Sequence, residues 1–155
     1  MNRLTGCYKR RLDASRRFRL PMAWCDGDNQ TWLLFPRHIV PPCDRIFRSL
    51  YLLPVNEHSL RAILSTSPAH TAGAPMLDAV LDVLRAHARQ HALDPSVATV
   101  TRTAPTATRT TLTTAQIGWL RYRGRTLIIV GSLNAAWIYT PTEWAKVKRS
   151  ARPPD

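Results

Sequence analysis

The sequence reads Tyr-Leu-Leu-Pro-Val-Asn-Glu-His over residues 51–58 and Trp-Ile-Tyr-Thr-Pro-Thr-Glu-Trp over residues 137–144. In both stretches an aromatic residue, an aliphatic residue, a strand end, a proline, a glutamate and a second ring follow one another in nearly the same order. Each stretch predicts a β-strand that runs directly into a capped helix. Upstream, Arg-Phe-Arg-Leu-Pro at residues 17–21 aligns with Arg-Thr-Thr-Leu-Thr at residues 109–113. We interpret this pattern as a tandem duplication of one β-rich unit.

The duplication predicts how the 155 residues are organised. We expect a first unit over residues 1–64, a linker and a helix over 65–98, a second and degenerate unit over 99–150, and a tail over 151–155. The helix is expected over 76–91, because the apolar residues there share one stripe at helical spacing: Leu77, Val80, Leu81, Leu84 and Ala88. The predicted fold class is therefore α+β and rich in β-strands.

Each unit supplies its own strands and a helix. Strand-like patterns bounded by turn residues occur at residues 17–20, 48–53, 126–130 and 136–139. Asn56 is placed to cap a helix that extends to Leu64, and Pro141 stands where a terminal helix tolerates proline. Residues 12–16 predict a tight turn, which makes the first 20 residues a hairpin.

The charge of the chain points to its partners. Lysine and arginine number 22 against 10 acidic residues, which gives a net charge of +12, and only three of the 22 are lysine. A GC-rich genome explains a preference for arginine over lysine, but it does not explain a deficit of carboxylates. An excess of this size favours nucleic acid, an anionic surface or an acidic protein as the partner. Residues 1–20 contain seven basic residues and only one acidic residue, Asp13.

Other classes of protein lack support in the sequence. We find no phosphate-binding glycine loop, no credible pair of carboxylates and no nucleophile with a nearby histidine, so we expect no enzymatic activity and no cofactor. The three cysteines match neither a disulfide framework nor a zinc site. His87 and His91 could share a metal, but solvated helix histidines are the better interpretation and no metal is expected. No membrane span or secretory signal is recognisable, so we expect a soluble, cytoplasmic protein.

The basic residues of the expected first hairpin indicate that the protein binds DNA. Arg17 and Arg19 alternate with apolar residues and so point to one face, and Arg16 adds a charge at the turn. The turn is bordered on its other side by three more cations: Lys9, Arg10 and Arg11. Arginine can form two hydrogen bonds with guanine or bind phosphate, and a β-ribbon fits the major groove. Asp13 is expected to accept from turn amides or to orient Arg17. Alternatively, these arginines form a solvated edge strand that discourages aggregation.

Five tryptophans occur along the chain: Trp24, Trp32, Trp119, Trp137 and Trp144. Stacking on single-stranded bases is one possible use for them. Because they sit inside apolar stretches, we expect roles in the core and in subunit interfaces instead.

The motifs resemble those of the MraZ family of bacterial transcriptional regulators, which are built from two tandem SpoVT/AbrB-type units. The opening Leu4-Thr5-Gly6, followed by residues 12–21 (Leu-Asp-Ala-Ser-Arg-Arg-Phe-Arg-Leu-Pro), is similar to the family pattern of a glycine and then L-D-x-x-G-R-x-x-x-P. The family's D-x-x-x-R appears as Asp13 and Arg17. Residues 127–131 (Leu-Ile-Ile-Val-Gly), with Trp137 and residues 141–144, resemble the V-x-L-V-G…W-x-x-E-x-W ending.

The resemblance implies a fold, a function and a set of site residues. The implied fold has two swapped-hairpin units that form a pseudo-two-fold β-barrel. The implied protein is a closed-ring homo-oligomer that binds short direct repeats in double-stranded DNA ahead of the division and cell-wall genes, and that occupies the nucleoid. Arg17 is then the residue that reads base or phosphate, Asp13 orients it, and Arg16 and Arg19 are auxiliary contacts. Arg109 is the equivalent of Arg17 in the second unit.

The chain departs from the family pattern at several positions. Arg16 stands where the first unit usually has glycine, so the turn loses its freest φ angle. In the second unit Pro105 replaces the aspartate, and Thr108 and Thr113 replace the glycine and the proline. We therefore expect Arg109 to contact phosphate only, or nothing. Two other functions stay open: an AbrB-like antitoxin that binds a toxin partner, and a small metal-dependent hydrolase that uses His87 and His91.

Overall fold

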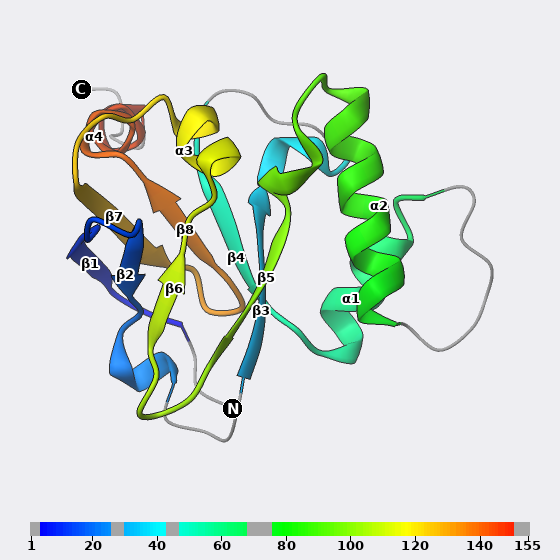
Figure 1. Cartoon of the computed structure of the whole chain (residues 1–155), viewed down its shortest axis with the longest axis horizontal. Helices are drawn as coiled ribbons and strands as arrows, with labels where there is room; N and C mark the ends of the chain where they lie inside the picture. Colours follow the sequence, from blue (N-terminus) through cyan, green and yellow to red (C-terminus); the bar gives the residue numbers. More distant parts are fainter. Residues whose placement is uncertain (1–3, 26–29, 43–46, 68–75, 151–155) are drawn as a thin grey trace.

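The computed structural model describes residues 4–25, 30–42, 47–67 and 76–150. This part of the chain forms a mixed α+β fold rich in antiparallel strands (Figure 1). Its strands are β1 (Cys7–Arg11), β2 (Arg17–Arg19), β3 (Gln30–Pro36), β4 (Leu50–Pro54), β5 (Thr99–Thr103), β6 (Arg109–Thr111), β7 (Thr126–Gly131) and β8 (Ala136–Tyr139). Its α-helices are α1 (Glu57–Leu64), α2 (Leu77–Gln90), α3 (Thr114–Leu120) and α4 (Pro141–Ser150). The expected tail over 151–155 lies outside the described residues.

Six strands form one sheet in the order β1-β7-β8-β4-β3-β5, and β2 pairs with β6 in a separate two-stranded ribbon. Every pairing is antiparallel. The sheet is open, because β1 and β5 stand at its two ends without pairing with each other. The expectation of a closed β-barrel is therefore wrong for the described residues. The physical reason is that β2 and β6 pair with one another in a separate ribbon, so neither strand joins β1 to β5 within the sheet.

The strand order has a two-fold symmetry. Exchanging β1 with β5, β2 with β6, β3 with β7 and β4 with β8 reproduces both sheets. The pairs nearest the axis are Tyr51 with Trp137 in the large sheet and Phe18 with Thr110 in the ribbon. Both pairs come from the stretches that the sequence aligns with one another. The first strand of each half pairs with the other half: β1 with β7, and β5 with β3. The expectation that residues 1–20 form a hairpin is therefore wrong, because β1 and β2 flank a tight turn but pair with strands of the second half and not with one another.

Two apolar cores lie on opposite faces of the large sheet. One lies between the sheet and the β2–β6 ribbon and contains Phe18, Leu20 and Leu112, each 1% exposed. The other lies beneath α1 and α2, which stand together beside β3 and β5 (Figure 1). Because the ribbon buries only one face, every second residue of β2 and β6 is left in solvent. This alternation decides which side chains can form a site.

Local signals fix the helices where the sequence predicts them. The Asn56 side chain accepts from the Ser59 N–H at 2.9 Å, so it caps α1 as expected. The stripe over 76–91 forms α2, with Val80, Leu84 and Ala88 buried. Thr113 and Gln116 form a capping box at α3. Among the helices of the described residues, none has the length and apolar character that a membrane span requires.

Candidate nucleic-acid interface

Asp13 organises the turn between β1 and β2. Its Oδ1 accepts hydrogen bonds from the backbone N–H groups of Ser15 at 2.8 Å and Arg17 at 3.0 Å, and its Oδ2 accepts from Arg17 Nε at 3.2 Å. The Arg17 N–H, helped by the Ser15 N–H and the Arg17 guanidinium, holds the pKa of Asp13 below its usual value. The carboxylate thus accepts from turn amides and also orients the guanidinium of Arg17, the two uses that the sequence suggests for it.

Arg16 adopts the left-handed backbone conformation, with a φ of 60°. The turn therefore keeps the geometry that glycine would allow, although an L side chain occupies the position at some cost in free energy. The Arg16 guanidinium donates to Thr114 Oγ1 at the start of α3. This side chain is therefore directed to the second half of the chain.

The β2–β6 ribbon presents arginines on its exposed face. In its register Arg17 faces Thr111, Phe18 faces Thr110, and Arg19 faces Arg109. Phe18 and Thr110 are buried, whereas Arg17, Arg19 and Arg109 are exposed. This confirms that Arg17 and Arg19 share one face.

The pairing of Arg19 with Arg109 is a close one. The Leu20 N–H donates to Thr108 O and the Leu112 N–H donates to Arg16 O, both at 2.9 Å. Since hydrogen-bonded and non-hydrogen-bonded pairs alternate along an antiparallel ladder, Arg19 and Arg109 form a non-hydrogen-bonded pair. The Cα atoms of such pairs are typically about 4.5 Å apart, the closer of the two spacings.

A groove of about 800 Å³ crosses this ribbon, and we call it the arginine groove. Among the described residues that line it, Asp13 is the one carboxylate and six are arginines: Arg10, Arg11, Arg17, Arg19, Arg102 and Arg109. Of the expected site residues, Lys9 and Arg16 are not in its lining. Arg10 Nε donates to Arg19 O at 3.1 Å, which holds β1 against the ribbon.

Arg102, on β5, is the site residue that sequence reasoning missed. Its side chain is exposed and lines the arginine groove. A signal was available, because Arg102 precedes Arg109 by seven residues, as Arg10 precedes Arg17. Extending the internal alignment upstream by one more strand places Arg10 and Arg102 at equivalent positions.

The tryptophans lie outside this groove, and none of the five lines it. Trp24 and Trp32 are buried, and Trp119 donates from Nε1 to Ser49 O at 3.0 Å.

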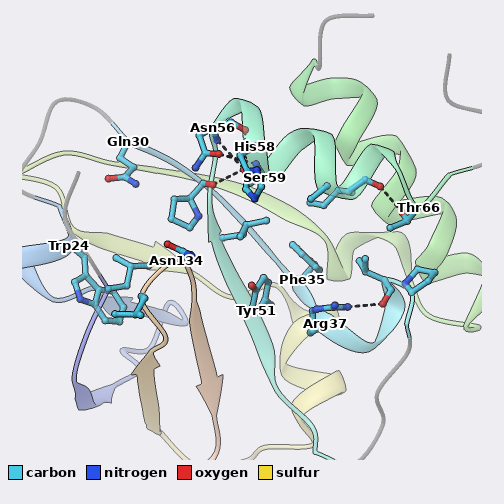
Figure 2. Close-up of a pocket in the computed structure, with 18 residues that line it drawn as sticks. Trp24, Gln30, Phe35, Arg37, Tyr51, Asn56, His58, Ser59, Thr66 and Asn134 are labelled. Carbon is cyan, nitrogen blue, oxygen red and sulfur yellow. Dashed lines mark hydrogen bonds between the residues drawn. The ribbon is translucent and has the colours of Figure 1, made fainter. Parts of the chain in front are cut away.

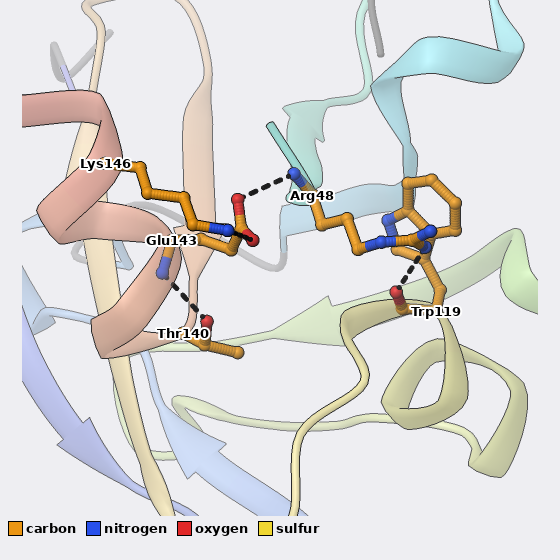
Figure 3. A network of polar contacts seen from close by, with 5 residues as sticks. All are labelled: Arg48, Trp119, Thr140, Glu143 and Lys146. Atoms are coloured by element: carbon orange, nitrogen blue, oxygen red, sulfur yellow. Dashed lines mark hydrogen bonds and ion pairs between the residues drawn. The ribbon is translucent and has the colours of Figure 1, made fainter. Parts of the chain in front are cut away.

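The Arg48 guanidinium lies 4.4 Å from the centre of the Trp119 ring and donates to the Trp119 carbonyl (Figure 3). Burial lowers the pKa of Arg48, and the charge of Arg121 acts in the same direction. Arg48 is thus a packed, structural arginine, in contrast with those of the groove.

Glu143 ties this structural arginine to helix α4. Its carboxylate accepts from the backbone N–H of Arg48 at 3.2 Å and from Lys146 Nζ at 3.1 Å (Figure 3). The glutamate that the two aligned stretches share therefore has a structural use in the second half.

The helix histidines are arranged differently from the expectation. His87 is 7% exposed and its Nε2 lies 3.0 Å from Thr66 Oγ1, so the prediction that it is solvated is wrong. The reason is that α1 and the residues after it pack over this face of α2. His91 Nδ1 lies 2.8 Å from the His87 carbonyl. Within the described ranges, no three His, Cys, Asp or Glu residues are grouped so that they could hold a metal ion.

Comparison of the sequence with models of known protein families and with curated proteins finds no match.

Proposed function

We propose that the chain is a DNA-binding transcriptional regulator of MraZ type that binds double-stranded DNA through the arginine groove and has no enzymatic activity. The observation that carries the proposal is the arginine groove itself, whose described lining contains six arginines and a single carboxylate. That carboxylate is already engaged with Arg17 at 3.2 Å. The phosphates of DNA supply the anions that this surface lacks within the described chain.

The shape of the ribbon supports duplex DNA as the ligand. A two-stranded antiparallel ribbon fits a major groove about 12 Å wide, and arginines on its exposed face can reach guanine edges or phosphates. Arg17 is held by Asp13 before any ligand binds, and a preorganised side chain loses less conformational freedom on binding. We therefore assign the base contact to Arg17, and phosphate contacts to Arg10, Arg102 and Arg109.

The topology supports the family proposal. In a swapped-hairpin arrangement, strands of one unit complete the sheet of the other. The pairing of β1 with β7 and of β5 with β3 is what such an arrangement requires. The two-fold symmetry of the strand order, and the interlocked pair β2–β6, are likewise expected of two tandem units of one ancestry. The open sheet is a departure from the barrel form of the family.

The family resemblance extends the proposal to assembly and target. One ribbon makes few contacts with DNA, so we propose that a homo-oligomer, in the form of a closed ring, engages several short direct repeats at once. The proposed targets are the division and cell-wall genes, and the proposed location is the nucleoid. Light scattering tests the assembly, because a clean species of 17.5 kDa at micromolar concentration would contradict it.

The decisive experiment compares two arginines that differ only in location. Arg102 lines the arginine groove, whereas Arg89 is exposed on α2 at the other side of the molecule (Figure 1). Fluorescence anisotropy with a labelled duplex should show weaker binding for Arg102→Gln and an unchanged affinity for Arg89→Gln. Equal losses for the two variants would mean that binding depends on overall charge alone, and the proposed interface would be wrong.

A further inference from the structure

A second groove, of about 880 Å³, runs along β4 beneath helix α1 (Figure 2), and we call it the α1 groove. The lining residues that matter here are Phe35, Arg37, Tyr51, Leu53, Ala62 and Ile63. Among the described residues, none lines both this groove and the arginine groove. Its volume lies in the range of small-molecule sites, which are about 300–1,000 Å³.

The floor of the α1 groove is apolar and aromatic. The Phe35 and Tyr51 rings meet edge to face at a centroid distance of 5.7 Å, and Trp137 packs against Tyr51 at 4.6 Å. Tyr51 and Leu53 are half-buried, so part of each remains available to a ligand. Burial raises the pKa of the Tyr51 hydroxyl, and the nearby charge of Arg37 acts in the opposite direction.

One end of the groove carries the cation of Arg37, which no carboxylate of the described residues neutralises. The Arg37 guanidinium lies 6.0 Å from the centre of the Tyr51 ring and donates from Nη1 to the Val40 carbonyl at 2.7 Å (Figure 2). Three ion pairs occur among the described residues, and Arg37 takes part in none of them. The described part of the lining contains His58 as a further basic residue and contains no aspartate or glutamate. The free N–H groups of Arg37 can therefore bind an anion.

The surrounding backbone disfavours a peptide as the occupant. β4 lies between β3 and β8 and is hydrogen-bonded on both sides, so an extended peptide finds no free strand edge to pair with. The Asn56 side chain accepts from the Ser59 N–H and the Ser59 hydroxyl accepts from the Asn56 N–H, so both side chains are engaged in the cap of α1. At the Arg37 end, the groove therefore offers apolar and aromatic side chains beside one guanidinium.

We propose that the α1 groove binds an amphipathic monocarboxylate, with its aliphatic chain on Tyr51 and Leu53 and its carboxylate on Arg37. The apolar chain removes the exposed parts of these two side chains from water, and the carboxylate forms charge-assisted hydrogen bonds with the guanidinium. We expect this site to act independently of DNA binding, since the described linings of the two grooves have no residue in common.

The probe is dodecanoate labelled with carbon-13 at its carboxyl group, used below its micelle-forming concentration and at moderate salt. Calorimetry and the carboxyl chemical shift should both report saturable binding. Arg37→Gln should weaken binding about tenfold, because a hydrogen bond to a charged group is lost. Ala62→Phe, which fills the groove from an exposed position on α1, should abolish it.

Matched controls separate this site from general attraction to a basic protein. Arg61→Gln on α1, Ala86→Phe on α2 and Arg102→Gln in the arginine groove should all bind dodecanoate as the unmodified chain does. Dodecanol should bind about tenfold more weakly than dodecanoate, because it lacks the charge. The proposal is overturned if no saturable binding occurs, if Arg61→Gln weakens binding as much as Arg37→Gln, or if Ala62→Phe leaves binding unchanged. Circular dichroism of each variant excludes loss of fold as the cause.

Discussion

Arg19 and Arg109 lie directly opposite one another on the exposed face of the β2–β6 ribbon. Two like charges at such a cross-strand position oppose folding. The nearest acid in the groove, Asp13, is engaged with Arg17, so neither arginine is neutralised by it. A local arrangement that works against stability is typical of residues retained for binding.

Removing this repulsion should stabilise the protein. We expect Arg109→Thr to raise the free energy of unfolding by about 0.2–1 kcal/mol at low salt, and to weaken DNA binding at the same time. Urea denaturation measures the first effect and anisotropy the second. Arg102→Thr is the control, since Arg102 faces Thr31 and no second arginine. If Arg102→Thr stabilised the protein as much as Arg109→Thr, the inferred repulsion between Arg19 and Arg109 would be contradicted.

The affinity for duplex DNA should fall steeply with salt. Arginines that neutralise phosphates release the condensed counterions, so the log–log slope is about −0.9 for each phosphate contacted. We expect a smaller slope for Arg102→Gln than for the unmodified chain, by about one unit. Titrations at several salt concentrations measure this slope. A slope near zero for the unmodified protein would exclude the arginine groove as the DNA-binding face.

The two halves should differ in what they contribute to DNA recognition. Arg17 is oriented by Asp13, whereas Pro105 occupies the equivalent position ahead of Arg109. Arg17→Ala should therefore cost about 1–3 kcal/mol at each engaged site and reduce the preference for operator over random DNA. Arg109→Ala should weaken binding to all sequences alike. Competition between operator and scrambled duplexes at fixed salt checks this, and the reverse result would exchange the two roles.

The left-handed backbone at Arg16 gives a test of the turn. Arg16→Gly removes the strain of an L side chain at a φ of 60°, so it should leave stability unchanged or slightly higher, although the bond to Thr114 is lost. Arg16→Val should lower it by about 1–2 kcal/mol, because a β-branched residue tolerates this region poorly. Thermal unfolding gives both values. Arg11→Val, on strand β1, controls for the loss of one exposed arginine.

The Asp13 carboxylate should make stability depend on acid pH. Its pKa in the folded protein lies below the unfolded value, so its stabilising effect is complete above the unfolded pKa and is lost as the pH falls through the folded one. Asp13→Asn should remove the part of the loss of stability at acid pH that comes from this carboxylate. Asp94, whose pKa is lowered by the Ser96 N–H, contributes separately. Unfolding curves recorded from neutral pH downward should therefore show additive effects of Asp13→Asn and Asp94→Asn.

The helices and strands could be predicted from the sequence, but the open form of the six-stranded sheet could not. The helix expected over 76–91 forms α2, and the Asn56 cap of α1 is present. Both could be predicted because each depends on residues that are only a few positions apart in the sequence. Closure of a barrel depends instead on pairing between distant strands. The withdrawal of β2 and β6 into their own ribbon leaves no signal in local periodicity.

The candidate site was predictable where strand alternation governs it. Alternation placed Arg17 and Arg19 on one face correctly. It could not show that Arg16 turns toward Thr114, since this contact joins residues 98 positions apart. Arg102 was missed because it lies in a threonine-rich stretch without neighbouring charge. Whether these residues bind DNA stays a prediction.

The exchange of strands between the halves has a consequence for synthesis on the ribosome. Cys7 on β1 pairs with Val130 on β7, so the first strand has no partner until nearly the whole chain has been made. Contacts of such long sequence separation form slowly, because the entropy of closing a large loop is lost before the contacts contribute any stabilising free energy. The strands β1 and β2, which do not pair with one another, therefore emerge without partners, and mutual repulsion among their arginines keeps them from joining the strand edges of other chains. Separately expressed halves should each be incomplete and should recover the fold only on mixing.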